Sequence, residues 1–599
     1  MGDSGVILSP KQQKILEATG NCVVNACPGS GKTFSVAARI AHLLKNKEFH
    51  HQGIAAISFT NTAWEEIEKK LKEDFQIDVP IRYPHFLGTI DSFVNKYVFL
   101  PYGHLLMGCE QRPDFVGGNS QNKISWQNPR RYNFVGGKRI CIYIDPDELF
   151  DKVSFDKEDK PISIANPQDF HFSWDDIYKN DKTYVKKVKD IVDNKWYRFK
   201  EGKACQADAN YFAYRLLNEF PLILKNIATR FPYLIIDEAQ DTTNVQMEIV
   251  NLLSQQTKEI MLIGDPDQAI FEWNHAKPEL FHEKIKQWAP PIELDENRRS
   301  SQKICDCANA FLGQVKSIPY EESEVKDYPF VPVLKEFNPD NTQSVAQIKD
   351  EFLALCNEKE IPEEKIAIIY RSKSFGEHFG KPIVKSEEHP WIVGKYFVRD
   401  LVQGKYLYEN GDFKKGFRYM EHGFHKSSTQ KSYLENNYIK EQIELKGFAP
   451  YRNELFDFIN LLPTCKGKDL NTWLAETNAK LNGKYTFDLE INSRHGGKAI
   501  DHYFGDSDFR QELNKYHIGT IHSVKGETYD AVLLFLTKNA GSAKDYKTIF
   551  NPPKKTEINE KDIEELRVIY VGLTRARKIL VVAVPNGCRD IWINKLKLE

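Results

Sequence analysis

The stretch "VVNACPGSGKTFSVAARI", Val23–Ile40, joins an apolar run to an amphipathic pattern through a loop of small residues. The apolar run is typical of a buried β-strand, and "FSVAARIAHLL" repeats apolar residues at helical spacing. A glycine-rich loop between a strand and a helix is the setting of a P-loop, in which backbone N–H groups and the helix N-terminus surround phosphate oxygens. We therefore predict that this loop binds the phosphates of a nucleotide.

The residues of this loop have separate expected roles. Gly29 and Gly31 let the backbone turn toward the phosphates. Lys32 is expected to reach the β- and γ-phosphates, and the Thr33 hydroxyl to bind Mg²⁺. Ala26 replaces the first glycine of the general pattern. The expected ligands of ATP and Mg²⁺ in this segment are Ala26, Cys27, Pro28, Gly29, Ser30, Gly31, Lys32 and Thr33.

A second apolar run, "FPYLIIDEAQDTT", ends in an acidic pair, Asp237 and Glu238. An acidic pair at the end of a buried strand is common by itself, but downstream of a P-loop it matches the Walker B position. We expect Asp237 to hold Mg²⁺, directly or through water. Glu238 is expected to orient or deprotonate the attacking water. The P-loop and this pair together predict a nucleoside triphosphatase.

A third run, "EIMLIGDPDQAIFEW", ends in polar residues, among which Gln268 is placed to sense the γ-phosphate. Two aromatic residues, Phe271 and Trp273, follow it. Either they form a platform on which nucleic-acid bases stack, each stack being worth ~1–3 kcal/mol, or they pack in the core. The first alternative is what a motor that grips bases beside its ATP site requires.

The order of motifs along the chain resembles that of the UvrD/Rep-type superfamily 1A DNA helicases. "LSPKQQKIL" resembles their Q motif, "DEAQD" their motif II and "GDPDQAIFEW" their motif III. Other matches are "ISFTNTAWEEI" (motif Ia), "GTIDSF" (Ib), "ENRRS" (IV), "KIAIIYRS" (the strand that follows IV), "IGTIHSVKGETYDAVLL" (V) and "IYVGLTRARKILVVAV" (VI).

This resemblance implies an α/β fold with two RecA-like domains, parallel sheets flanked by helices, each carrying a largely helical insertion. It also implies that Gln12 reads adenine and that two arginines of the second domain, Arg299 and Arg575, face the γ-phosphate. His522 is expected to have a structural or a strand-contact role. The implied single-strand DNA path is lined by Phe59, Thr60, Asn61, Thr89, Ser92, Trp273, Thr520, His522 and Ser523.

The chain departs from the family pattern at three positions. Arg298 stands where motif IV offers a tyrosine that stacks on adenine, and a guanidinium plane can also stack. Asn274 stands where motif III has an arginine after its tryptophan. Thr528 stands where motif V has a glutamate that contacts ribose. The base, phosphate and ribose contacts are therefore expected to differ from those of the family.

The motifs divide the 599 residues into motor and insertion segments. We expect residues 1–98 and 205–290 to form the first RecA-like domain, and residues 291–375 and 511–599 the second. Residues 99–204 and 376–510 are expected to be the insertions, domains 1B and 2B. The first insertion interleaves basic and aromatic residues, which suits DNA contact, although a solvated helical lobe has the same composition.

Composition limits the remaining possibilities. The formal net charge is -2, so a nucleic-acid surface must be a local groove rather than a whole-chain field. No apolar run is long enough to cross a bilayer, and the N-terminus lacks a signal pattern, so we expect a cytoplasmic protein. The chain ends soon after motif VI, so any nuclease is expected to be a separate partner.

These observations predict an ATP-dependent single-stranded DNA translocase and helicase that acts on single-stranded and tailed duplex DNA. The family resemblance implies 3′ to 5′ polarity. The alternative is an ATP-switched DNA-end sensor or assembly subunit of a nuclease-containing complex, which unwinds little. Small UvrD-like proteins also resemble components of phage-defence systems, so both DNA repair and antiviral defence remain open.

Overall fold

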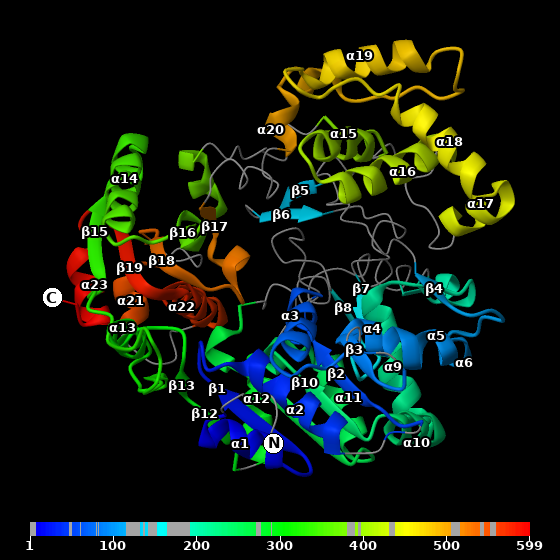
Figure 1. The fold of residues 1–599 in the computed structure, drawn as a ribbon. Helices are drawn as coiled ribbons and strands as arrows, with labels where there is room; N and C mark the ends of the chain where they lie inside the picture. The colour runs from blue at the N-terminus through cyan, green and yellow to red at the C-terminus, as the bar shows by residue number, and fades with distance from the viewer. Residues whose placement is uncertain are drawn as a thin grey trace.

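The computed structural model describes the chain in two sheet-containing domains and a helical lobe (Figure 1). Residues outside its description are 1–7, 47–48, 50, 60, 79–80, 82, 116–131, 136–137, 142–152, 164–191, 194, 271–276, 289, 380–389, 393–396, 430–437, 505–515, 539–543, 552–558 and 599. In the described part of the chain, no helix is both long and apolar enough to span a membrane.

The first domain is built on a six-stranded parallel sheet in the order β12-β1-β11-β10-β2-β3. Its strands are almost continuously apolar because helices cover both faces of the sheet. The strands are β1 (Cys22–Ala26), β2 (Ile54–Ser58), β3 (Phe86–Thr89), β10 (Tyr233–Ile236), β11 (Glu259–Gly264) and β12 (Ile292–Leu294).

The two faces of this sheet have separate cores. One core holds α1 (Pro10–Glu17), α2 (Lys32–Asn46) and α3 (Asn61–Glu73). The opposite core is formed by α4 (Ile90–Val94), the π-helix η1 (Asn95–Phe99), α9 (Gln206–Glu219), α10 (Pro221–Arg230), α11 (Asn244–Ser254) and α12 (Pro278–Gln287). β12 pairs with β1, so residues 292–294 lie in the first sheet, just beyond residue 290, where we expected the first motor segment to end.

The second domain has a five-stranded parallel sheet in the order β15-β19-β18-β16-β17. One face packs on α13 (Gln302–Leu312), α21 (Tyr546–Phe550), α22 (Glu560–Leu573) and α23 (Arg589–Leu596), and the other on α14 (Thr342–Glu358). The strands are β15 (Val333–Phe337), β16 (Ile366–Tyr370), β17 (His517–Thr520), β18 (Tyr529–Phe535) and β19 (Ala576–Pro585). The predicted fold class, parallel sheets flanked by helices, is confirmed.

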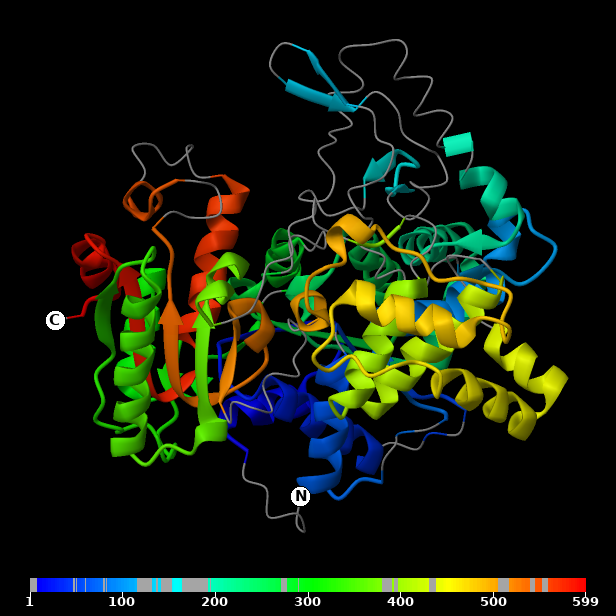
Figure 2. The same cartoon turned by 90° about the horizontal axis from the view of Figure 1, so that it is seen from above.

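The segment between β16 and β17 forms the helical lobe, which is coloured yellow-green to orange and lies over the first domain in Figures 1 and 2. Its helices α15 and α16 cross closely because Gly404 faces Gly416. A Cβ at Gly404 would lie 2.8 Å from the Gly416 carbonyl oxygen, which leaves room for no side chain. The helices of the lobe are α15 (Phe397–Glu409), α16 (Phe413–Thr429), α17 (Tyr438–Lys446), α18 (Phe448–Ile459), α19 (Leu470–Leu481) and α20 (Ile500–Phe504).

The described residues of the first insertion contain short strands as well as helices. A buried ion pair, Lys195 Nζ to Asp208 Oδ1 at 2.8 Å, anchors this insertion to α9. The elements are α5 (Leu100–Tyr102), α6 (His104–Met107), β4 (Asp114–Phe115), β5 (Tyr132–Val135), β6 (Lys138–Cys141), β7 (Val153–Phe155), β8 (Pro161–Ser163) and β9 (Lys203–Ala204).

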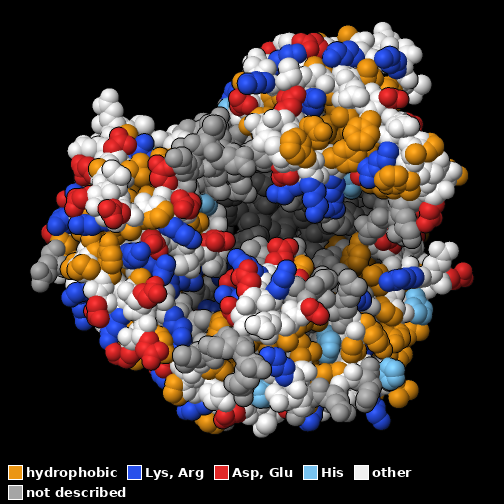
Figure 3. Space-filling model, viewed as in Figure 1, with side chains coloured by type: hydrophobic (Ala, Val, Ile, Leu, Met, Phe, Trp, Pro, Cys, Tyr) orange, Lys and Arg blue, Asp and Glu red, His pale blue; other side chains and the backbone are white. Residues whose placement is uncertain are grey.

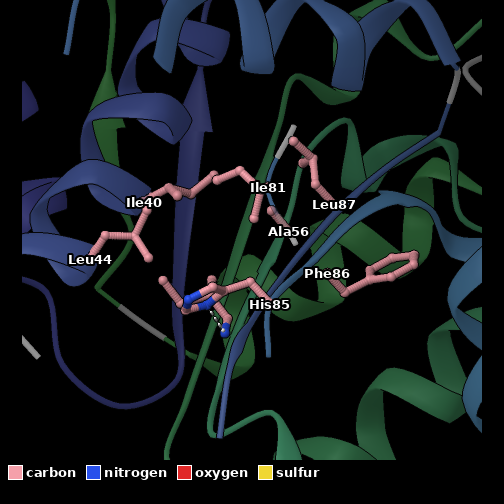
Figure 4. Close-up of a pocket in the computed structure, with 8 residues that line it drawn as sticks. Ile40, Leu44, Ala56, Ile81, His85, Phe86 and Leu87 are labelled. Carbon is pink, nitrogen blue, oxygen red and sulfur yellow. Dashed lines mark hydrogen bonds between the residues drawn. The ribbon is translucent and has the colours of Figure 1, made fainter. Parts of the chain in front are cut away.

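A small apolar pocket lies between α2 and the edge of the first sheet (Figure 4). Ile40, Leu44 and Leu87 line it, and the His85 ring closes one end. His85 Nδ1 accepts a hydrogen bond from the Ile54 N–H at 3.1 Å, and burial lowers the pKa of His85. The neutral imidazole therefore helps to fix the start of β2.

Candidate functional site

The P-loop lies against a segment of the second domain. It connects β1 to α2, and Gly29 and Gly31 have φ angles of +71° and +79°. A Cβ at Gly29 would lie 2.5 Å from both Arg299 Cβ and Asn297 Oδ1. The Arg298 N–H also donates to the Gly29 carbonyl oxygen at 2.8 Å. Glycine is therefore needed at position 29 both for backbone conformation and for the close approach of the motif IV segment.

The acidic pair stands at the carboxyl end of β10, as predicted. Asp237 is buried, and burial followed by the neighbouring Glu238 carboxylate raises the pKa of Asp237 well above its usual value. Burial alone would raise the pKa of Glu238, but Lys32 and Lys525 hold it below its usual value. Asp237 is buried and Glu238 is half-buried, and their pKa values shift in opposite directions. A cation bound nearby would favour the charged form of Asp237, while Glu238 is already held as a carboxylate that can accept a hydrogen bond from water.

The chemistry of these residues fits Mg²⁺. A buried carboxyl whose pKa is raised gains from a nearby cation, and Lys32 and the Thr33 hydroxyl lie at the adjoining N-terminus of α2. In the described residues no group of three or more His, Cys, Asp or Glu side chains could form a protein-only metal cage. Mg²⁺ usually binds one or two protein oxygens together with nucleotide phosphates and water, so Asp237 and Thr33 are a suitable pair.

Gln268 lies in the turn η4 (Pro266–Gln268), which follows β11. Its Nε2 donates to Asp265 Oδ2 at 2.6 Å, and its Oε1 accepts from Arg575 Nη2 at 2.7 Å. Asp265 belongs to the first domain, whereas Arg575 follows α22 of the second. The side chain expected to sense the γ-phosphate therefore joins the two domains.

The two predicted finger arginines lie together at this junction. Arg575 is 1 % exposed and donates from Nε to the Val571 carbonyl oxygen at 2.9 Å. Arg299 Nη1 donates to the Thr574 carbonyl oxygen at 3.2 Å. Burial, and then the adjacent Arg299 cation, lower the pKa of Arg575 to about 9, and burial lowers the pKa of Arg299. Two neighbouring cations, of which Arg575 is buried and Arg299 half-buried, form a strong site for an anion.

Two lysines of the second domain make ion pairs with carboxylates of the first. Lys525 Nζ lies 2.6 Å from Asp241 Oδ2, and Lys316 Nζ lies 2.5 Å from Asp265 Oδ1. These pairs are largely buried. We call this contact the interdomain seam and define it by Asp241, Asp265 and Gln268 of the first domain and Lys316, Lys525 and Arg575 of the second.

Unpaired hydrogen-bond donors mark the expected base-binding position. Gln12 is fully buried and caps α1 by accepting from the Ser9 N–H at 3.1 Å, while its Nε2 has no partner in the described part of the chain. That nitrogen is 3.4 Å from the position of a Cβ at Gly31. The Arg298 guanidinium lies 3.8 Å above the Tyr320 ring, and its Nε and Nη2 also lack partners among described residues. These hydrogen-bond donors of Gln12 and Arg298 are suited to bind the acceptor atoms of a nucleotide base.

The residues implied for the DNA path lie at the carboxyl ends of strands in both sheets. The Thr89 hydroxyl, at the end of β3, accepts from the Ser92 N–H at 3.2 Å. At the end of β17, the Ser523 hydroxyl donates to the Thr520 carbonyl oxygen at 2.7 Å. These hydroxyl groups are in positions from which they could contact phosphates.

The other residues of the implied path are less informative. His522 is half-buried in the turn η11 (Ile521–Val524), and Phe59 packs on the core of the first domain. Thr60, Trp273 and the Asn61 side chain lie outside the described residues, as do Phe271 and Asn274.

Sequence reasoning did not single out four residues of this site: Lys316, Lys525, Asp241 and Tyr320. Asp241 and Lys525 stand inside motifs II and V, so their position in these motifs could have indicated functional residues. Lys316 and Tyr320 lie in "GQVKSIPY", where no local pattern indicates a functional residue. Their contacts depend on how the two domains meet.

The chain matches two family models. The UvrD/REP helicase N-terminal domain matches residues 8–289, and the UvrD-like helicase C-terminal domain matches residues 504–586. These matches cover segments of both sheet domains.

Known relatives share this similarity. DNA helicase II of Haemophilus influenzae is 27% identical over 316 residues, which cover 51% of this chain but only 40% of that protein. The ATP-dependent DNA helicase PcrA of Leuconostoc citreum is 23% identical over an alignment that covers 96% of this chain and 81% of the relative. The Gabija protein GajB of Bacillus cereus is 23% identical over 598 residues, 98% of each chain. The chain belongs to the UvrD/Rep-type superfamily 1A helicase family.

Proposed function

We propose that this protein is an ATP-dependent single-stranded DNA translocase that unwinds tailed duplexes in the 3′ to 5′ direction. The observation that carries the proposal is the hydrogen bond between Gln268 and Arg575, 2.7 Å long, which joins the two sheet domains at the seam. A nucleotide held there contacts groups from both domains. Hydrolysis at such a site changes how the domains meet, which is what a translocase requires.

The proposed hydrolysis divides its tasks between the domains. Lys32 binds the β- and γ-phosphates, and Glu238 orients the attacking water and accepts its proton. Arg299 and Arg575 stabilise the charge that develops on the γ-phosphate, an effect worth ~10³–10⁵ in rate for arginine fingers. Thr33 and Asp237 would hold Mg²⁺, which would neutralise phosphate charge.

Movement along DNA follows from closure and opening of the seam. The Thr89–Ser92 hydroxyls belong to the first domain and the Thr520–Ser523 hydroxyls to the second, so each domain has its own contact with phosphates. Hydroxyl and backbone groups bind phosphates without reading sequence. Alternating grip by the two domains advances the strand. Figure 3 shows a hollow between the helical lobe and the first domain, with Lys and Arg side chains on its lobe side.

The biological setting we favour is antiviral defence together with a separate nuclease subunit. The match with GajB, which covers 98% of each chain, supports it. DNA repair is the other setting. The second candidate function, an ATP-switched assembly subunit that unwinds little, rests on the same match in length.

A strand-displacement assay with matched 3′-tailed and 5′-tailed duplexes tests the proposal. We expect ATP-dependent unwinding of the 3′-tailed substrate and none with Lys32→Ala. Preference for the 5′ tail would contradict the polarity. DNA-stimulated ATP hydrolysis without displacement of either substrate would favour the assembly subunit.

A further inference from the structure

Lys316 has no role in the chemistry described so far, yet it is one of the two lysines of the seam and makes two ion pairs across it. It follows α13 of the second domain and reaches two carboxylates of the first, Asp265 Oδ1 at 2.5 Å and Asp267. The Lys316 side chain is 11 % exposed and that of Asp265 is fully buried. Burial alone would lower the pKa of Lys316, but the two carboxylates raise it above its usual range.

The contacts of Asp265 show what this lysine controls. Asp265 uses one oxygen for Lys316 and the other, Oδ2, for Gln268 Nε2 at 2.6 Å. Because the Gln268 amide nitrogen is held on that side, its oxygen must face the other way, toward Arg575 Nη2 at 2.7 Å. A continuous chain of four side chains therefore runs from Lys316 to the finger arginine.

Removing the cation from this chain would change its far end. An unpaired buried carboxylate is strongly unfavourable, so Asp265 would take up a proton or turn toward solvent. In either case Gln268 would lose a charge-assisted hydrogen bond, which is stronger than a neutral one. The Gln268 amide could then rotate and present its nitrogen to Arg575, which would separate the two groups.

We propose that Lys316 is a positioning residue for ATP hydrolysis, which orients Gln268 and Arg575 through Asp265. The inference rests on the proposed function. Lys316 and Arg575 come from the second domain, whereas Asp265 and Gln268 come from the first. Opening the seam withdraws Lys316 from Asp265 and Arg575 from Gln268 at once, so hydrolysis is restricted to the closed arrangement.

The first measurement compares Lys316→Met with wild type in steady-state ATP hydrolysis, with saturating oligo(dT). The kcat is expected to fall by about ten- to a hundredfold, less than for a group that contacts the transition state directly, while KM for ATP changes less than twofold. Lys326→Met is the matched control, because Lys326 pairs with Glu321 inside the second domain, away from the seam. Lys316→Arg keeps the charge and should retain most of the wild-type kcat. This comparison with wild type does not depend on whether the Met variant folds.

The decisive measurement is a double-mutant cycle with Gln268→Ala. If Lys316 acts through Gln268, the double variant is no slower than Gln268→Ala alone. Rate losses that multiply, or a K316M variant with wild-type kcat, would overturn the inference while wild-type hydrolysis still supports the proposed function. Absence of DNA-stimulated hydrolysis in wild type would overturn both.

Discussion

Replacing Arg575 by methionine should abolish most ATP hydrolysis without lowering the stability of the fold. The fold lowers the pKa of Arg575 from 12.5 to about 9. A depressed pKa of a basic group means that the folded state disfavours its charged form, at every pH below 9. The shift corresponds to about 5 kcal/mol at 1.36 kcal/mol per pH unit. Methionine removes this cost and fills much of the space, while the unpaired Gln268 oxygen costs roughly 1–3 kcal/mol.

We therefore expect Arg575→Met to unfold at the same or a higher temperature than wild type in the absence of nucleotide. Hydrolysis should fall by ~10³-fold or more because the γ-phosphate loses one cation. Arg577→Met is the control: Arg577 pairs with Asp530 at 3.0 Å away from the seam, and its variant should keep its activity. The assays are calorimetry and DNA-stimulated phosphate release. A destabilised variant that hydrolyses ATP normally would refute the reasoning on both counts.

Two further predictions concern the ATP site, and a third concerns the helical lobe. Glu238→Gln should bind ATP as wild type does but should not hydrolyse it. Filter binding and single-turnover hydrolysis would measure these two properties. Normal turnover would show that Glu238 does not activate the attacking water. Arg298→Ala should raise KM for ATP severalfold with little change in kcat, since Arg298 lies on Tyr320 at the base position; an unchanged KM would contradict stacking. Burial, and then Lys446, lower the pKa of His425 to about 4. The neutral imidazole is hydrogen-bonded to Tyr451 and contributes fully to the stability of the lobe above pH 6.5. This contribution is lost as the pH falls toward 4, because protonation of His425 then favours the unfolded state. Melting followed by circular dichroism should show this loss, and His425→Gln should reduce it.

The sequence predicted those parts of the fold and site that depend on local pattern. The buried run before Asp237 and the glycines before Lys32 each carry their signal within a few residues, because a strand end and a phosphate loop are local structures. The domain boundary expected at residue 290 excludes the strand Ile292–Leu294, because its partner β1 lies far back in the sequence.

The seam could not be predicted in the same way. Gln268 and Arg575 are separated by 307 positions, and Lys316 is 51 positions from Asp265. Their hydrogen bonds form only where the two separate sheet domains meet, and no periodicity in the sequence indicates that contact. Family resemblance indicated Arg575 because it stands in a motif, whereas Lys316 stands in none.

Whether one triphosphate is bound by both domains can be seen in a structure with a non-hydrolysable ATP analogue, Mg²⁺ and a short single-stranded DNA. We expect Lys32 on the β- and γ-phosphates and both guanidinium groups, Arg299 and Arg575, within hydrogen-bonding distance of the γ-phosphate. A bound triphosphate that contacts only the first domain, with both arginines turned away from it, would rule out hydrolysis between the two domains.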